Sequence, residues 1–226
     1  MKTHETKPVV DSNQYAKLVA AYETIVKHLM SGSEDANFRS NFTDTPERCV
    51  RALLASNKTD DQLYAEINHI ISRVFPIRDR ETSGMVTQGP VTVNSMCPHH
   101  LAPVRYEAFI SYIPAGGLVL GLSKLARIAK ILGQRAVLQE QLAADIADVL
   151  YAPPSPDTNE DGMRWPALRT TGSAVTLVGT HTCMACRGIE SDARTTTTEL
   201  RGAYWEPGIE LKFQTSIGIT RNARPF

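Results

Sequence analysis

Apolar residues recur at steps of three and four positions along the first third of the chain. Residues 15–30 carry such a stripe, formed by Leu18, Ala21, Ile25 and Leu29. This spacing predicts an amphipathic helix whose apolar face needs a partner surface. A second helix is expected to have Thr45 as its N-cap and Pro46 as its first helical residue. A third helix is expected at about residues 62–74.

From residue 85 onward the pattern changes to that of strands. Residues 85–96 are rich in β-branched side chains, and residues 104–113 alternate apolar positions with polar Arg105 and Glu107. Both segments predict strands that pair antiparallel. Further strands are expected at residues 174–178 and 209–213. In the last strand the apolar face would consist of Ile209, Leu211 and Phe213, and its other face would be solvated or would meet another subunit.

Two consecutive helices are expected between these groups of strands. The first has one apolar face, made of Leu125, Ile128, Ala129 and Leu132. Ser123 is expected to cap its beginning and Gly133 to close its end. The second is marked by Leu138, Leu142, Ile146 and Val149. Residues 153–172 are rich in Pro, Asp, Asn and Gly, which predicts a long surface loop.

This order of elements predicts an α+β fold in which two helices pack on one face of an antiparallel sheet. We expect residues 1–14 to form a flexible tail and residues 15–82 an N-terminal helical region. Residues 83–226 would then form the catalytic domain, with the surface loop at 153–172.

Composition and charge narrow the classes of function. The 226 residues are 42% hydrophobic and 21% charged, which excludes a disordered or low-complexity chain. The 24 basic and 24 acidic residues balance, so no net charge favours nucleic acid or an anionic membrane, and an anionic ligand must be held by a local cluster. No window reaches the roughly 18 apolar residues of a membrane span. The polar N-terminus lacks a secretory signal, so a cytoplasmic location is expected.

Two short runs concentrate the residues that bind metals. Cys-Pro-His-His occupies positions 97–100, and His-Thr-Cys-Met-Ala-Cys occupies positions 181–186. Thiolate and imidazole ligands in short pairs predict a zinc site. In one interpretation Cys97, His100 and Cys183 hold a catalytic Zn²⁺, while His99 and His181 act as acid and base. In the alternative, Cys186 is the fourth ligand of a closed structural site.

Several charged residues near these runs suggest an anionic substrate. Lys124 and Arg127 lie at i and i+3 in the first turn of a predicted helix, where phosphates bind well. Arg187 directly follows the second metal-binding run. Each of these cations is also compatible with an ordinary solvated surface charge. Taken singly, Gln139 and Glu140 give no specific functional signal either. Together, a glutamate beside an amide can recognise the N1–H and 2-amino edge of guanine.

Taken together, the segments SMCPHH, GLSKLARI, VLQEQL and HTCMACRGI, followed by TTTT, resemble the signature blocks of the GTP cyclohydrolase I family in the same order. The resemblance extends over about residues 15–215. It implies the tunnelling fold, in which the sheets of neighbouring subunits join into a barrel. It also implies a homodecamer of two pentamers with active sites at subunit interfaces.

The same resemblance implies a role for each matched residue. Cys97, His100 and Cys183 would bind Zn²⁺, and His99 and His181 would transfer protons. The triphosphate of GTP would be held by Lys124, Arg127, Arg187 and Arg48, and guanine and ribose by Glu140, Gln139 and Ser123. The implied reaction hydrolyses GTP at C8, releases formate and gives 7,8-dihydroneopterin triphosphate, a step toward pterins and tetrahydrofolate.

The chain departs from the family pattern at three places. Pro98 stands where the family usually has glutamate, Cys186 stands where it generally has a residue that does not bind metal, and the loop at 153–172 is longer than usual. A divergent paralogue that acts on GTP or another guanine nucleotide and stops after C8 hydration or ring opening is therefore a second hypothesis. A structural zinc module is a third hypothesis. The fourth is a tunnelling-fold nitrile reductase of the queuosine route, which would use a nucleophilic cysteine without zinc. A neutral chain with 7% aromatic residues gives no signal for nucleic-acid binding.

Overall fold

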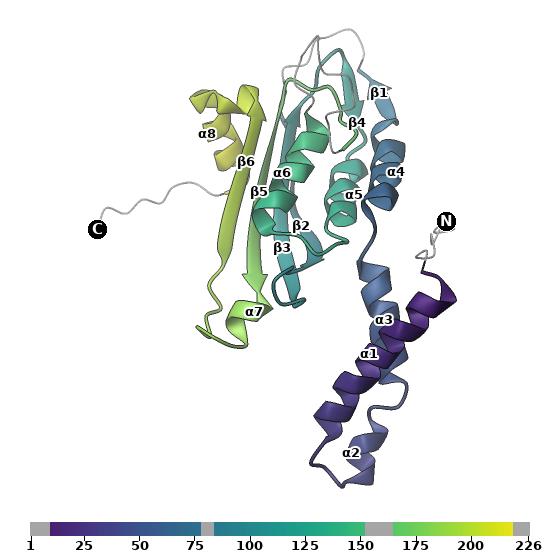
Figure 1. Cartoon of the computed structure of the whole chain (residues 1–226). Helices are drawn as coiled ribbons and strands as arrows, with labels where there is room; N and C mark the ends of the chain where they lie inside the picture. Colours follow the sequence, from purple (N-terminus) through teal and green to yellow (C-terminus); the bar gives the residue numbers. More distant parts are fainter. Residues whose placement is uncertain (1–9, 78–83, 152–164, 219–226) are drawn as a thin grey trace, which may run out of the picture. The chain divides into compact units, whose positions relative to one another are not determined.

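The computed structural model describes residues 10–77, 84–151 and 165–218 (Figure 1). Tertiary contacts divide the chain into two compact units, Met1–Lys58 and Thr59–Phe226. Within the described ranges, none of the helices combines the length and the apolar composition that a membrane span requires.

The first unit contains three helices: α1 (Ser12–Met30), α2 (Ala36–Ser40) and α3 (Thr45–Ser56). Helix α1 begins earlier than predicted because the Asp11 carboxylate accepts a hydrogen bond from the Gln14 N–H at 2.7 Å. Residues 12–14 of the predicted tail thus belong to α1, and residues 1–9 lie outside the described part. The N-cap of α3 is Asp44, one residue before the predicted Thr45.

Helix α1 packs against α3. Val26 of α1 and Val50 of α3 are the buried residues of these two helices. The predicted stripe is only partly covered, since Ile25 and Leu29 are 52% and 58% exposed. The amphipathic helix is therefore present, and its buried face is offset from the one predicted.

The second unit is built on a four-stranded antiparallel sheet of order β2-β3-β5-β6. Its strands are β2 (Val86–Met96), β3 (Pro103–Ile113), β5 (Gly172–His181) and β6 (Thr195–Gly202). A separate short pair joins β1 (Val74–Pro76) to β4 (Leu118–Leu120). Alternation along β3 buries Val104, Tyr106 and Ala108 as predicted. Strand β6 contains the Thr-rich run and was not predicted as a strand.

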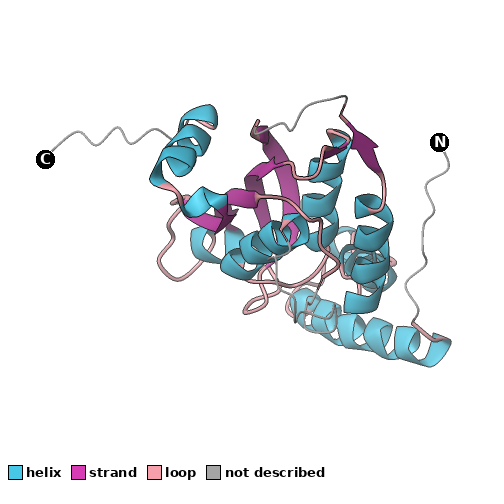
Figure 2. Cartoon of the chain, turned by 90° about the horizontal axis from the view of Figure 1, so that it is seen from above, coloured by secondary structure: helices cyan, strands magenta, loops and turns pink. Residues whose placement is uncertain are grey.

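Helices α5 (Ser123–Leu132) and α6 (Gln139–Leu150) cover one face of this sheet, in agreement with the predicted α+β arrangement (Figures 1 and 2). Helix α4 (Asp60–Ile71) packs against α5 and contributes Leu63, Ile67 and Ile70 to the same core. The predicted cap at Ser123 is not formed, because the N-cap residue is Leu122 and no side chain caps the helix.

The prediction of a strand at residues 209–213 is wrong, because these residues belong to helix α8 (Pro207–Ser216). Five alternating residues do not distinguish a strand from a helix, in which positions i and i+4 also share a face. Ile209 and Phe213 pack together with Tyr204 against the second face of the sheet, and Leu211 is 62% exposed. Pro207 is tolerated because it lies in the first turn, where its missing N–H costs little.

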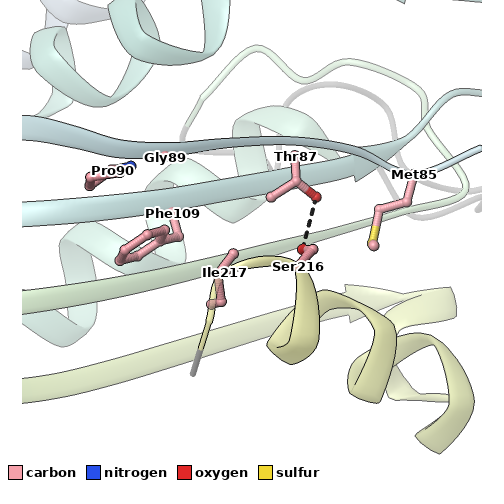
Figure 3. Close-up of a pocket in the computed structure, with 7 residues that line it drawn as sticks. All are labelled: Met85, Thr87, Gly89, Pro90, Phe109, Ser216 and Ile217. Carbon is pink, nitrogen blue, oxygen red and sulfur yellow. Dashed lines mark hydrogen bonds between the residues drawn. The ribbon is translucent and has the colours of Figure 1, made fainter. Parts of the chain in front are cut away.

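Beside α8, the second face of the sheet carries a pocket of about 520 Å³ (Figure 3). It is lined by Met85, Thr87, Gly89, Pro90, Phe109, Ser216 and Ile217. Its side-chain polar groups are the hydroxyls of Thr87 and Ser216, which lie 3.5 Å apart. Among the described residues, this lining includes no charged or titratable side chain.

The predicted loop at 153–172 falls largely on residues 152–164, which lie outside the described part of the chain. Its last residues pack inward: Trp165 is buried, and the Thr170 hydroxyl donates to the Leu150 carbonyl at 2.6 Å. Buried Arg135 lies over the Trp165 ring and forms an ion pair with buried Asp145 of α6. These contacts fix the chain where it re-enters the sheet at β5.

Candidate metal centre and active site

The structure brings together the three residues predicted as metal ligands. The ligand atoms of Cys97, His100 and Cys183 all lie within 4.8 Å of one another. In tetrahedral zinc sites, bond lengths of about 2.0–2.3 Å place neighbouring ligand atoms about 3.5–3.8 Å apart, so a small contraction closes this group on an ion. Two thiols and an imidazole are also the donor set that zinc prefers. Cys97 is buried and His100 is exposed, which leaves one side of the group open.

A tight turn after β2 presents the first two ligands. The Cys97 N–H donates to the Ala102 carbonyl, and the Leu101 N–H donates to the Cys97 carbonyl, both at 2.9 Å. Leu101 has φ of 51°, a left-handed conformation that reverses the chain before β3. Pro98 lies in this turn with its side chain exposed.

The third ligand comes from the end of β5, which pairs with β3 so that Val104 lies opposite His181. Cys183 follows on the short helix α7 (Thr182–Ala185). The Thr182 hydroxyl donates to the Pro103 carbonyl at 2.6 Å and ties α7 to the start of β3. Sheet register and this hydrogen bond therefore bring together ligands that are more than eighty positions apart.

The two thiols of the group interact directly. Burial and a hydrogen bond with Cys97 raise the pKa of the Cys183 thiol, and the nearby charge of Arg187 opposes this rise. These effects favour the protonated thiol of Cys183, and a bound cation would favour its thiolate form instead. Arg187 is therefore placed close to the metal group, as the sequence suggested.

His181 is held beside this group by two neighbours. Its Nε2 lies 2.8 Å from Oε1 of Gln139, and its ring meets the edge of Tyr106 with centroids 5.8 Å apart. Burial lowers the pKa of His181, and the negative charge of Glu140 partly offsets that effect. Burial thus favours the neutral form of the ring, which lies near a carboxylate.

Tyr106 joins the site although its position on β3 indicated only a core residue. Burial raises the pKa of its phenol, and the charges of Cys97, Glu140 and Cys183 raise it further. These effects place the exposed Glu140 carboxylate within electrostatic range of the metal group. The register of β3 against β5 was the information needed to find Tyr106, and sequence alone does not supply it.

A second group of residues lies around the N-terminus of α5. Partial burial lowers the pKa of Lys124, and the positive charges of Arg127 and Arg73 lower it further. Arg73, directly after the end of α4, was not among the predicted residues. Lys124 thus lies within electrostatic range of two further cations, and such a concentration of positive charge favours an anion.

Of the remaining predicted residues, Cys186, His99 and Arg48 fall outside these two groups, and Ser123 adjoins Lys124. Cys186 is exposed and does not belong to the set of mutually close ligand atoms found among the described residues. His99 is exposed, and its ring centroid lies 6.2 Å from that of His100. Ser123 is the first residue of α5 and is exposed. Arg48 lies on α3 in the first unit with an exposed side chain.

Comparison with known proteins gives consistent matches. A sequence model of the family described as GTP cyclohydrolase I matches residues 22–217. The chain is 33% identical over 168 residues to a GTP cyclohydrolase 1 of Thermoanaerobacter pseudethanolicus, covering 74% of this chain and 78% of that protein. It is 31% identical over 206 residues to a GTP cyclohydrolase 1 of Streptococcus pyogenes, covering 87% and 91%. A solved structure of an archaeosine synthase QueF-Like, in the apo form, aligns with a TM-score of 0.33 and 18% identity over 53% of this chain and 96% of that chain.

Proposed function

The chain belongs to the GTP cyclohydrolase I family of hydrolases, and we propose that it is a zinc-dependent enzyme that converts GTP to 7,8-dihydroneopterin triphosphate and formate. The observation that carries this proposal is the composition of the metal group. Three protein ligands lie together, and Cys186 is not among them. A catalytic zinc site needs a free coordination position, whereas a structural site is closed by a fourth protein ligand.

Zn²⁺ held by Cys97, His100 and Cys183 would supply Lewis acidity that activates water near neutral pH for attack at C8 of the purine. His99 and His181 are the proposed proton carriers, which protonate the purine at N7 and serve the later ring-opening and rearrangement steps. The position of His181 beside the metal group supports its role, and His99 is assigned from its match to the family pattern. General acid–base action of this kind contributes about 10²–10⁴-fold to rate.

The substrate would be held by groups of opposite charge at its two ends. The Glu140 carboxylate suits the N1–H and 2-amino group of guanine, since both are donors. Lys124 and Arg127 suit the triphosphate, together with Arg187, Arg48 and the newly identified Arg73. Ser123 is the proposed contact to ribose. The cation group around Lys124 supports this assignment because its like charges are relieved when an anion binds.

We further propose a cytoplasmic homodecamer of two pentamers with active sites between subunits. Strands β2 and β6 form the edges of the described sheet, and edge strands pair readily with another chain. The exposed apolar residues Ile25 and Leu29 of α1 provide a second surface that favours burial against another chain.

A truncated reaction is the second candidate, and Pro98 is the observation that favours it. Proline in the turn that presents Cys97 and His100 provides no carboxylate to orient a histidine. Loss of such an orienting group typically reduces activity 10- to 100-fold. The enzyme would then release a ring-opened product from GTP or another guanine nucleotide.

The test is incubation of the zinc-loaded protein with GTP, followed by mass spectrometry, pterin fluorescence and an assay for formate. The full reaction yields one formate for each fluorescent pterin. Ring-opened products without pterin support the truncated reaction. Unchanged GTP contradicts the full reaction, and unchanged GTP, GDP and GMP in the presence of folded, zinc-loaded protein contradict both. The variant Cys97→Ala is the matched negative control.

A further inference from the structure

Gln139, the first residue of α6, has both hydrogens of its side-chain amide committed to the protein. Its side chain is 3% exposed. Its Nε2 donates to the Leu177 carbonyl at 3.0 Å and to the Thr195 carbonyl at 2.9 Å. Its Oε1 lies 2.8 Å from Nε2 of His181. A buried amide with these three contacts bridges β5, β6 and the candidate active site.

The chemistry of these partners fixes the orientation of the amide. Backbone carbonyls only accept hydrogen bonds, so the NH₂ group of Gln139 must face Leu177 and Thr195. A flipped amide would set its oxygen against two carbonyl oxygens and leave three acceptors without a donor in a buried site. The Gln139 oxygen therefore faces His181 in either state of that histidine.

We propose that Gln139 is a positioning residue that holds His181 in the tautomer with hydrogen on Nε2. An amide oxygen only accepts, so the histidine nitrogen facing it must donate. In the neutral ring the lone pair is then on Nδ1, and a hydrogen bond of this kind commonly sets the tautomer. In the reaction proposed above, on which this step rests, His181 would take up and return protons through Nδ1.

The surrounding sheet is built to accommodate this contact. Tyr106, Gly179 and Thr195 lie in one row across β3, β5 and β6. A Cβ on Gly179 would lie 2.6 Å from the Tyr106 ring and 3.0 Å from Oε1 of Gln139. The absent side chain of Gly179 thus leaves the space in which the aromatic ring and the amide support His181.

The same network changes the expected role of Gln139 toward substrate. Both amide hydrogens are used by backbone carbonyls, so none is left for the acceptor atoms of guanine. Recognition of the guanine donors then falls to the exposed carboxylate of Glu140. Gln139 would affect the rate of the reaction through His181 and would leave GTP affinity largely unaffected.

The test compares Gln139→Met, which keeps side-chain length without an acceptor, with Gln141→Met, an exposed neighbour on α6 that serves as the matched control. Solid-state ¹⁵N NMR of the zinc-loaded full-length protein labelled at histidine reports which ring nitrogen carries hydrogen. The signal of His181 is assigned from its absence in His181→Asn. We expect a protonated Nε2 and an unprotonated Nδ1 in the wild type and in Gln141→Met, and a shift toward a mixture in Gln139→Met.

Kinetics provide the second readout. Gln139→Met should retain its zinc and bind GTP within about twofold of wild type, while turnover falls about 10- to 100-fold, as is typical for the loss of an orienting group. Hydrogen on Nδ1 of wild-type His181 would refute the proposal, as would a loss of GTP affinity equal to the loss of turnover. If the wild type leaves GTP unchanged but carries hydrogen on Nε2, the proposed reaction fails and the positioning of His181 stands.

Discussion

The metal group and the cation group of the second unit are built in opposite ways. Around Cys97 and His181, several side chains are partly or fully buried and hydrogen-bonded to one another or to the sheet, whereas the ligand His100 is exposed. Around Lys124, two further cations lie within electrostatic range and disfavour its charged form. The hydrogen bonds of the first group are made within the protein, whereas in the second the binding of an anion would relieve the repulsion.

This difference separates the two tasks of the proposed enzyme. Proton transfer and water activation depend on groups held in the correct geometry, which a preorganised site provides. Binding of a flexible triphosphate depends more on charge than on position, and exposed cations on helix ends supply it. Substitutions in the metal group should therefore reduce turnover, and those in the cation group should reduce affinity.

The largest effect is expected for Cys97→Ala. Loss of one of three protein ligands should release zinc and reduce formate production by a factor on the order of 10³ or more. Metal analysis and the formate assay measure the two losses. Cys186→Ser is the matched control and should keep one zinc per chain, because Cys186 lies outside the group of close ligand atoms. Zinc loss from Cys186→Ser would support the closed structural site instead.

The next largest effect is expected for His99→Ala. His99 is not among the mutually close ligand atoms of the described residues, so the variant should keep its zinc. Turnover should fall about 10²–10⁴-fold if the imidazole carries protons in the reaction. Zinc content and single-turnover rates test the two parts separately. Turnover at the wild-type rate would remove His99 from the mechanism.

The metal group could be predicted from sequence because its ligands lie in two short runs, Cys97 to His100 and His181 to Cys183. The role of Gln139 could not, because two of its partners are backbone carbonyls on β5 and β6 whose positions depend on strand register. Tyr106 shows the same limit, since alternation identifies a buried face and says nothing of what lies beside it. Arg73 reaches Lys124 through the packing of α4 on α5 and the pairing of Val74 with Leu120, neither of which the sequence pattern shows.

The fold was predictable to a similar extent. Helical spacing of apolar residues over ten or more positions identified α5 and α6, and alternation of apolar and polar residues identified β3. The segment at residues 209–213 was misassigned because five residues fit the period of a strand and that of a helix equally well. The structure forms a helix here, which packs Phe213 against the second face of the sheet. The Thr-rich strand β6 lacks an apolar alternation that would reveal it.

A smaller effect, on binding, is expected for Lys124→Ala. Loss of one charge-assisted contact of about 1.5–3 kcal/mol should weaken GTP binding roughly 10- to 100-fold. The affinity of the variant for guanosine, which has no phosphate, should be almost the same as that of the wild type. Titrations of both ligands at two salt concentrations measure this, because contacts between exposed charges are screened by salt. Equal losses for GTP and guanosine would contradict the phosphate assignment.

The smallest effect is expected for Arg73→Ala, and its sign should differ between the free and the bound protein. In the free protein burial, then Arg127, then Arg73 lower the pKa of Lys124, so charged Lys124 costs stability below that lowered pKa. This cost disappears as the pH rises toward 10.5. Arg73→Ala should therefore stabilise the free protein slightly at neutral pH and reduce its gain in stability on going to alkaline pH. GTP binding should instead weaken by only a few-fold, since an exposed charge contributes little in water. Thermal unfolding without GTP measures the stability of the free protein, and unfolding with GTP measures the stabilisation by the ligand. A variant that is less stable than wild type in both conditions would mean that Arg73 supports the fold rather than the anion site.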